Sequence, residues 1–111
     1  MGMMMMTKEL LKALPKLRTY ENAKAEDVPI AVKFFDPTGS WTWYATEGDV
    51  MPDGDIEFFG LVRGFETELG YFRLSDLQNA KAGMRGMRAL PIERDRNFGK
   101  HTLKEAMDRA I

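Results

Sequence analysis

The side chains that could do chemistry in this 111-residue chain are mostly carboxylates. Five lie within a short acidic stretch: Glu47, Asp49, Asp53, Asp55 and Glu57. Carboxylate oxygens are the ligands that Ca²⁺ and Mg²⁺ prefer, so this stretch is a candidate cation site. Its spacing differs from that of an EF-hand loop, in which the acids alternate before the glycine. A solvated acidic loop is therefore the preferred interpretation, and a cation site is the alternative.

Other side chains that could act as nucleophiles or metal ligands are scarce in the sequence. The sequence has no cysteine, one histidine, His101, and two serines, Ser40 and Ser75. This composition excludes disulfide scaffolds, thiolate zinc sites, cysteine nucleophiles and histidine-rich metal sites. A Ser/His/Asp triad would need His101, which stands beside a predicted helix cap and is expected at the surface. Phosphate-binding glycine loops are absent from the sequence. We therefore expect no catalytic residue, no metal and no cofactor.

An aromatic run is the first candidate for binding. Trp41, Trp43 and Tyr44 lie in one predicted strand, and Glu47 follows just beyond it. The two tryptophans share one face of that strand and Tyr44 points to the other. Packing in the core is the preferred interpretation, because large aromatic side chains dominate the buried area of small domains. The alternative is that one face stays exposed and binds a partner protein.

A second candidate lies near the C-terminus, where Glu93, Arg94 and Asp95 alternate in charge. Local ion pairing that pins this segment to the domain is the preferred interpretation. The alternative is a polar edge that recognises a partner protein.

Charge is uneven along the chain, although the formal net charge is only −1. Residues 36–80 carry nine acidic side chains against two arginines, and residues 81–111 carry eight basic side chains against four acidic ones. A basic C-terminal third could contact phosphates of a nucleic acid. The candidate residues for such contacts are Arg85, Arg88, Arg94, Arg96 and Lys100. The overall balance nevertheless favours a mixed, solvated surface.

The predicted elements give an α+β domain over residues 7–111, with residues 1–6 as a disordered or extraneous start. Four strands with turn-length connections predict an antiparallel four-stranded meander, which could be strongly bent. A small barrel is the alternative. Short helices are expected at the N-terminus, after the last strand and at the C-terminus. Thr7 is expected to cap the first of them, and Thr102 and Glu105 have the spacing of a capping box at the start of the last. The predicted strands are 30–35, 41–46, 56–63 and 70–74, and the helices span 8–14, 76–83 and about 103–111, with residues 47–55 as a loop.

The order of several blocks resembles a known family. These blocks are Lys33-Phe34-Phe35 with Pro37, Trp41–Glu47, Phe58–Val62, Glu68–Phe72 and Leu90–Asp95. Together they resemble the small bacterial family called domain of unknown function 2958, over roughly Thr7 to Leu103. The resemblance implies a bacterial protein often encoded on plasmids and other mobile elements, and it implies no catalytic residue. The chain departs from the family pattern at Ala82–Arg88 and around Asn97–Lys100.

Two functions from different classes follow from these observations. The first is a non-catalytic protein-binding or accessory module of a mobile element, with Trp41, Trp43, Tyr44, Glu47, Glu93, Arg94 and Asp95 as candidate contacts. The second is a nucleic-acid-binding accessory protein that uses the basic C-terminal third. The absence of cysteine favours the cytoplasm, and no apolar run approaches the length of a membrane span.

Overall fold

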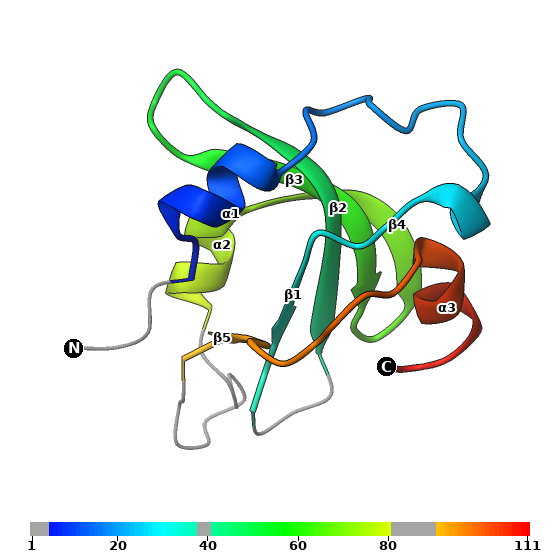
Figure 1. The fold of residues 1–111 in the computed structure, drawn as a ribbon. Helices are drawn as coiled ribbons and strands as arrows, with labels where there is room; N and C mark the ends of the chain where they lie inside the picture. Colours follow the sequence, from blue (N-terminus) through cyan, green and yellow to red (C-terminus); the bar gives the residue numbers. More distant parts are fainter. Residues whose placement is uncertain (1–4, 38–40, 81–90) are drawn as a thin grey trace.

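The computed structural model describes residues 5–37, 41–80 and 91–111. Its helices and strands confirm the α+β class and add one short strand to the predicted four (Figure 1). In chain order the elements are α1 Lys8–Ala13, the 3₁₀ helix η1 Ala25–Asp27, β1 Val32–Phe35, β2 Thr42–Val50, β3 Ile56–Arg63, β4 Thr67–Arg73, α2 Leu74–Asn79, β5 Glu93–Arg94 and α3 Leu103–Asp108. None of these helices is long and apolar enough to cross a membrane.

The strands form one antiparallel sheet in the order β4-β3-β2-β1-β5. The first four strands are the predicted meander, in which each strand pairs with its neighbour in the chain. The fifth, β5, pairs with β1 at Phe34↔Arg94 and Phe35↔Glu93. Because β5 is so short, β1 lies at a sheet edge that is only partly covered, while β4 stands at the opposite edge.

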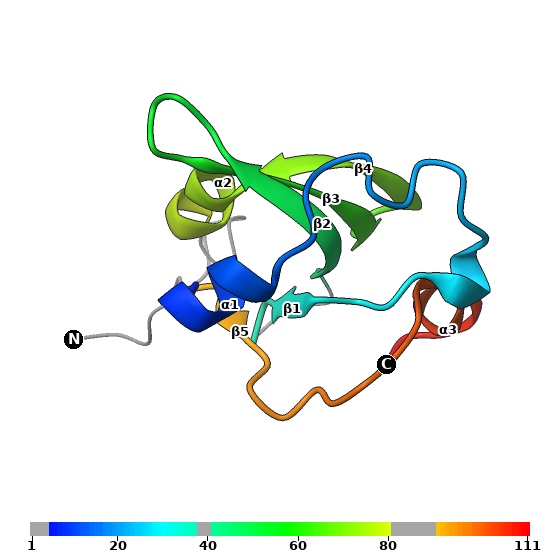
Figure 2. The ribbon, with the colours of Figure 1, turned by 45° about the horizontal axis from the view of Figure 1, so that its top comes forward.

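The sheet carries a hydrophobic core on each face, because successive side chains of a strand point in opposite directions. Trp43 and Phe34 belong to the core on the face covered by α1 and α2. Tyr44 and Leu61 belong to the other core, which is covered by η1 and α3. Figure 2 shows η1 and α3 side by side, although they come from opposite ends of the chain. Helices on both faces therefore bury both sides of the aromatic strand.

Local capping signals set the helix ends. The hydroxyl of Thr7 accepts the backbone N–H of Leu10 at the start of α1, as predicted. At α3, Thr102 and Glu105 form the predicted capping box. The third helix start differs from the prediction, because α2 begins at Leu74 rather than at residue 76. Here the carboxylate of Asp76 accepts the backbone N–H of Arg73, the residue just before the helix, so Asp76 caps the helix from within its first turn.

Other boundaries also differ from the sequence prediction. Strand β1 starts at Val32 rather than at residue 30, and α2 and α3 end at Asn79 and Asp108 rather than near residues 83 and 111. Strand β2 continues to Val50, so the predicted loop over residues 47–55 is shortened to a turn after that residue. Strand β4 starts at Thr67 rather than at residue 70, which lengthens the last hairpin of the meander. At the N-terminus, Met6 is buried in the core and Met5 packs against that core, so these two residues belong to the fold. Flexible methionine side chains fill irregular gaps of this kind well.

Candidate functional site

An open groove of about 450 Å³ lies on the face of α3 and η1 and is lined by several side chains that could bind a partner. Segments before η1, the middle of the sheet and α3 all contribute to it. We call it the β4 groove, and its lining residues are Arg18, Tyr20, Glu21, Ala23, Ala25, Val28, Thr46, Glu47, Phe59, Leu69, Tyr71, Leu103 and Met107. Of the residues that the sequence singled out for binding, only Glu47 lies there.

A β-bulge brings Glu47 into the β4 groove. The pairing of β2 with β3 runs Ala45↔Gly60 and then Glu47↔Phe59, so Thr46 is an extra residue in β2. A bulge disturbs strict alternation and can turn two adjacent side chains toward one face. Thr46 and Glu47 accordingly both line the groove, and both are buried. The bulge therefore places a carboxylate where regular alternation would have turned it away.

The Glu47 carboxylate is held by two neighbours. Its Oε1 accepts the backbone N–H of Arg18 over 3.0 Å. Its Oε2 lies 3.0 Å from the hydroxyl of Thr46, which also lies 3.1 Å from the carbonyl oxygen of Phe59. A hydroxyl has one proton, so Oε2 and that carbonyl compete for it. Glu47 is thus a buried acid with one firm donor and one shared donor.

The segment before η1 forms one wall of the β4 groove. It is fastened to β2 by the backbone N–H of Gly48, which donates to the carbonyl of Pro15, and by that of Leu17, which donates to Asp49. Arg18 in this wall has φ 72°, the left-handed region that residues with a side chain rarely adopt. Its guanidinium hydrogen-bonds Glu21 over 2.8 Å, and that contact raises the pKa of Arg18 above its ordinary value.

Aromatic and apolar side chains form the remaining walls. Phe59 and Tyr71 pack edge to face with ring centroids 5.0 Å apart. Three side chains stay largely exposed at the rim: Leu69 at 46%, Tyr71 at 61% and Met107 at 45%. The β4 groove therefore combines an apolar rim with a buried carboxylate at its floor.

The aromatic candidates of β2 lie mostly inside the protein. Trp43 and Tyr44 are buried on opposite faces of the sheet, so neither offers a side chain to a partner, and their interpretation as exposed contacts is corrected. Trp41 is half-buried, next to Trp43 and Phe65. The helices on both faces explain this outcome, since they cover β2 on both sides at Trp43 and Tyr44.

The acidic stretch does not converge. Asp49 accepts a backbone N–H from the segment before η1, and Asp55 is bound to Ser75 at the start of α2. Asp53 pairs with Arg73 over 3.2 Å. Within the described ranges there is no group of three or more histidine, cysteine or acidic side chains placed to hold a metal ion. Asp53 and Asp55 share Arg73, whose guanidinium also lies 3.8 Å from the Asp55 carboxylate, whereas Glu47 and Asp49 bind the segment before η1.

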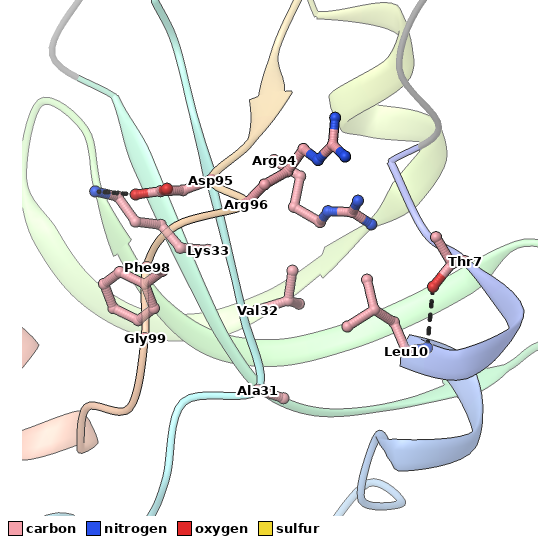
Figure 3. Close-up of a pocket in the computed structure, with 10 residues that line it drawn as sticks. All are labelled: Thr7, Leu10, Ala31, Val32, Lys33, Arg94, Asp95, Arg96, Phe98 and Gly99. Atoms are coloured by element: carbon pink, nitrogen blue, oxygen red, sulfur yellow. Dashed lines mark hydrogen bonds and ion pairs between the residues drawn. The ribbon is translucent and has the colours of Figure 1, made fainter.

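The candidates at β5 lie around a second open pocket of about 300 Å³, next to α1 (Figure 3). Asp95 turns away from the pocket's arginines and pairs with Lys33 over 3.4 Å. Arg94 and Arg96 extend toward α1, and Arg94 lies 3.4 Å from the carbonyl oxygen of Met5. Glu93 pairs with β1 through its backbone and is half-buried. The structure thus brings two guanidinium groups to one pocket.

The other basic candidates are dispersed or not described. Lys100 is exposed beyond the pocket of Arg94 and Arg96. Arg85 and Arg88 lie outside the described residues. So does the whole of Ala82–Arg88, one of the two segments in which the chain departs from the family pattern.

Sequence reasoning missed most of the β4 groove. Leu69 and Tyr71 carry the one signal that could have been used, because they are two residues apart in a strand and therefore share a face. Arg18 and Tyr20 come from a polar stretch without regular structure, and Met107 lies on α3 near the other end of the chain. Their meeting depends on contacts between distant segments.

Three comparisons with known proteins bear on this chain. A family described as "Protein of unknown function (DUF2958)" matches residues 5–110. No curated protein and no solved structure matches the chain significantly.

Proposed function

Because the chain belongs to the DUF2958 family, whose function is unknown, its role must come from its own surface, and we propose that it is a non-catalytic protein-binding module. The β4 groove is the binding face in this proposal. A role as an accessory factor of a mobile element rests on the family resemblance alone.

The observation that carries the proposal is the clustering of exposed apolar side chains. In the described part of the chain, five large hydrophobic residues are conspicuously exposed, and three of them, Leu69, Tyr71 and Met107, line the β4 groove. Contiguous exposed apolar surface on a small protein is typical of binding sites. Tyrosine and methionine are enriched at such interfaces. The polar floor supplies the specificity that apolar contacts lack.

The chemistry at the groove supports binding rather than catalysis. His101, the one histidine of the sequence, lies away from the groove and binds Glu105 over 3.1 Å at the start of α3. Glu47 has one carboxylate neighbour in the groove lining, Glu21, and that residue is engaged by Arg18. An acid and base pair around a reacting bond would need two available groups.

The test compares capture by matched variants. Tagged wild-type protein, a Leu69→Ala/Tyr71→Ala variant and a Phe65→Ala variant are each used to capture proteins from bacterial lysate treated with nuclease. Phe65 is an exposed aromatic residue that does not line the groove, so it is the control. We expect a protein that the wild type and the control retain and the double variant loses. Equal capture by all three, or no capture after nuclease treatment, would overturn the proposal.

A second candidate function is favoured by the pocket of Arg94 and Arg96. Two guanidinium groups directed into one pocket suit a phosphate, and this supports the nucleic-acid alternative. The expected result is an affinity for nucleic acid that falls steeply between low and high salt, because phosphate contacts release counterions. Arg94→Gln/Arg96→Gln should weaken it, whereas Arg109→Gln, an exposed arginine outside the pocket, should not. Salt-independent binding would contradict this function.

A further inference from the structure

We propose that the β4 groove receives an arginine side chain of the partner protein, with its guanidinium bound to the carboxylate of Glu47. This inference rests on the proposed function and names the chemistry that the partner must present. It follows from the hydrogen bonds of Glu47, the charges around it and the nature of the groove walls.

The hydrogen-bonding capacity of Glu47 is only partly used. A carboxylate offers about four acceptor positions, two on each oxygen. Oε1 receives the N–H of Arg18, and Oε2 shares the Thr46 proton with a backbone carbonyl. One or more positions on each oxygen therefore remain open. A guanidinium donates two parallel N–H bonds to the two oxygens of one carboxylate, so it matches the open acceptor positions on Oε1 and Oε2 better than a single donor does.

The charge of Glu47 also lacks a partner. In residues 5–37, 41–80 and 91–111, no lysine, arginine or histidine nitrogen lies within 4.0 Å of its carboxylate. The neighbouring Arg18 is taken by Glu21. Arg63 donates to the carbonyl of Ala106 at the end of α3, and Arg73 pairs with Asp53. Both arginines of the acidic segment 36–80 are thus engaged elsewhere, and buried carboxylates are normally paired.

The walls favour arginine over lysine. A guanidinium is planar, is more weakly hydrated than an ammonium and stacks on aromatic faces. Tyr20, Phe59 and Tyr71 line the groove together with Glu47. The exposed Leu69 and Met107 can cover the aliphatic stem of the incoming side chain. A lysine would place a compact, strongly hydrated charge in the same apolar surroundings.

The test uses nuclear magnetic resonance titration of the full ¹⁵N-labelled chain with N-acetyl-arginine amide. The backbone amide of Arg18 is the reporter, because it donates to Glu47. The citrulline analogue, which has the same shape without the charge, is the matched ligand control. We expect the arginine compound to shift this amide saturably and to bind about tenfold tighter than the citrulline compound, as losing a charge-assisted hydrogen bond costs roughly 1.4 kcal/mol or more.

Two variants separate the charge of Glu47 from its structural role. Glu47→Gln keeps the shape and can donate to Thr46 while that hydroxyl donates to Phe59, so the fold is retained. It should bind the arginine and citrulline compounds equally. Glu68→Gln removes the same charge from β4 at a residue that does not line the groove, and it should preserve the preference. Equal binding of both compounds to the wild type, or no shift with either, overturns the inference.

Failure of this inference can be told apart from failure of the proposed function. If Leu69→Ala/Tyr71→Ala loses the captured partner but Glu47→Gln retains it fully, the groove binds protein without an arginine contact. If neither variant affects capture, the groove is not the binding face at all.

Discussion

The backbone N–H of Arg18 donates to Oε1 of Glu47 over 3.0 Å, joining a strained turn to a buried carboxylate. Arg18 makes this bond with its backbone in the left-handed region. Residues held in that region persist where the surrounding structure fixes them, and they concentrate at functional sites. The strain and the buried acid therefore belong to one arrangement, which sets the shape of the β4 groove.

The strain at Arg18 can be measured by comparing two substitutions. Both Arg18→Gly and Arg18→Ala remove the exposed ion pair with Glu21, which contributes little to stability. Only glycine relieves the left-handed backbone, whose cost for other residues is about 1 kcal/mol or more. We expect the glycine variant to be more stable than the alanine variant by about 1 kcal/mol in urea denaturation. Equal stabilities would mean that the turn is not strained.

Two opposed glycines predict opposite effects of the same substitution. Gly60 and Gly70 face each other across β3 and β4. A Cβ on Gly60 would overlap the carbonyl oxygen of Tyr44, whereas a Cβ on Gly70 would meet nothing within 4 Å. Gly60→Ala should therefore lower the free energy of unfolding by about 3 kcal/mol or more. Gly70→Ala should raise it by about 0.5 kcal/mol, because it restricts the unfolded chain. Denaturation of both variants checks the pair.

Asp55 gives a pH-dependent contribution to stability. The hydroxyl of Ser75 donates to its carboxylate, and this bond, with backbone N–H donors from Ile56 and Ser75, lowers the pKa of Asp55. A carboxyl with a lowered folded-state pKa stabilises the fold above its unfolded pKa of about 3.9. That contribution is lost as the pH falls through the lower, folded value.

We therefore expect Asp55→Asn to melt below the wild type at pH 7 and the gap to shrink below about pH 4. Asp27→Asn, at an exposed residue of η1, is the control and should change little at any pH. A gap for Asp55→Asn that widened as the pH fell would contradict the assigned hydrogen bonds.

Local signals made most of the fold predictable. The caps at Thr7 and Thr102 act within one helical turn, so a short window of sequence contains all that they need. Strand β3 was predicted with its observed ends, because its aromatic and branched residues stand between two glycine-containing turns. Strand β5 was missed, because two residues carry no pattern and its pairing with β1 depends on contacts about sixty positions away.

The site was harder to predict than the fold. Glu47 was singled out, but as the end of an aromatic strand and the start of an acidic loop. Gly48 and Asp49 are poor strand formers, so the strand was predicted to end at residue 46 although β2 continues to Val50. The bulge at Thr46 arises from the pairing of β2 with β3, and no local sequence pattern predicts it. The partner Arg18 lies 29 positions earlier, in a segment without regular structure.

The junction between η1 and α3 has a consequence for how the protein opens. Ile30 donates to the carbonyl of His101, and Leu103 donates to that of Val28, so two short bonds join segments more than seventy residues apart. These two segments can separate while the four-stranded meander stays folded, because local opening costs less free energy than global unfolding. In native-state hydrogen exchange, the amides of Ile30 and Leu103 should therefore open at lower free energy than those in the middle of β2 and β3. Val28 and Leu103 also line the β4 groove. A ligand bound in the groove would therefore contact both segments, hold them together and slow the exchange of the Ile30 and Leu103 amides.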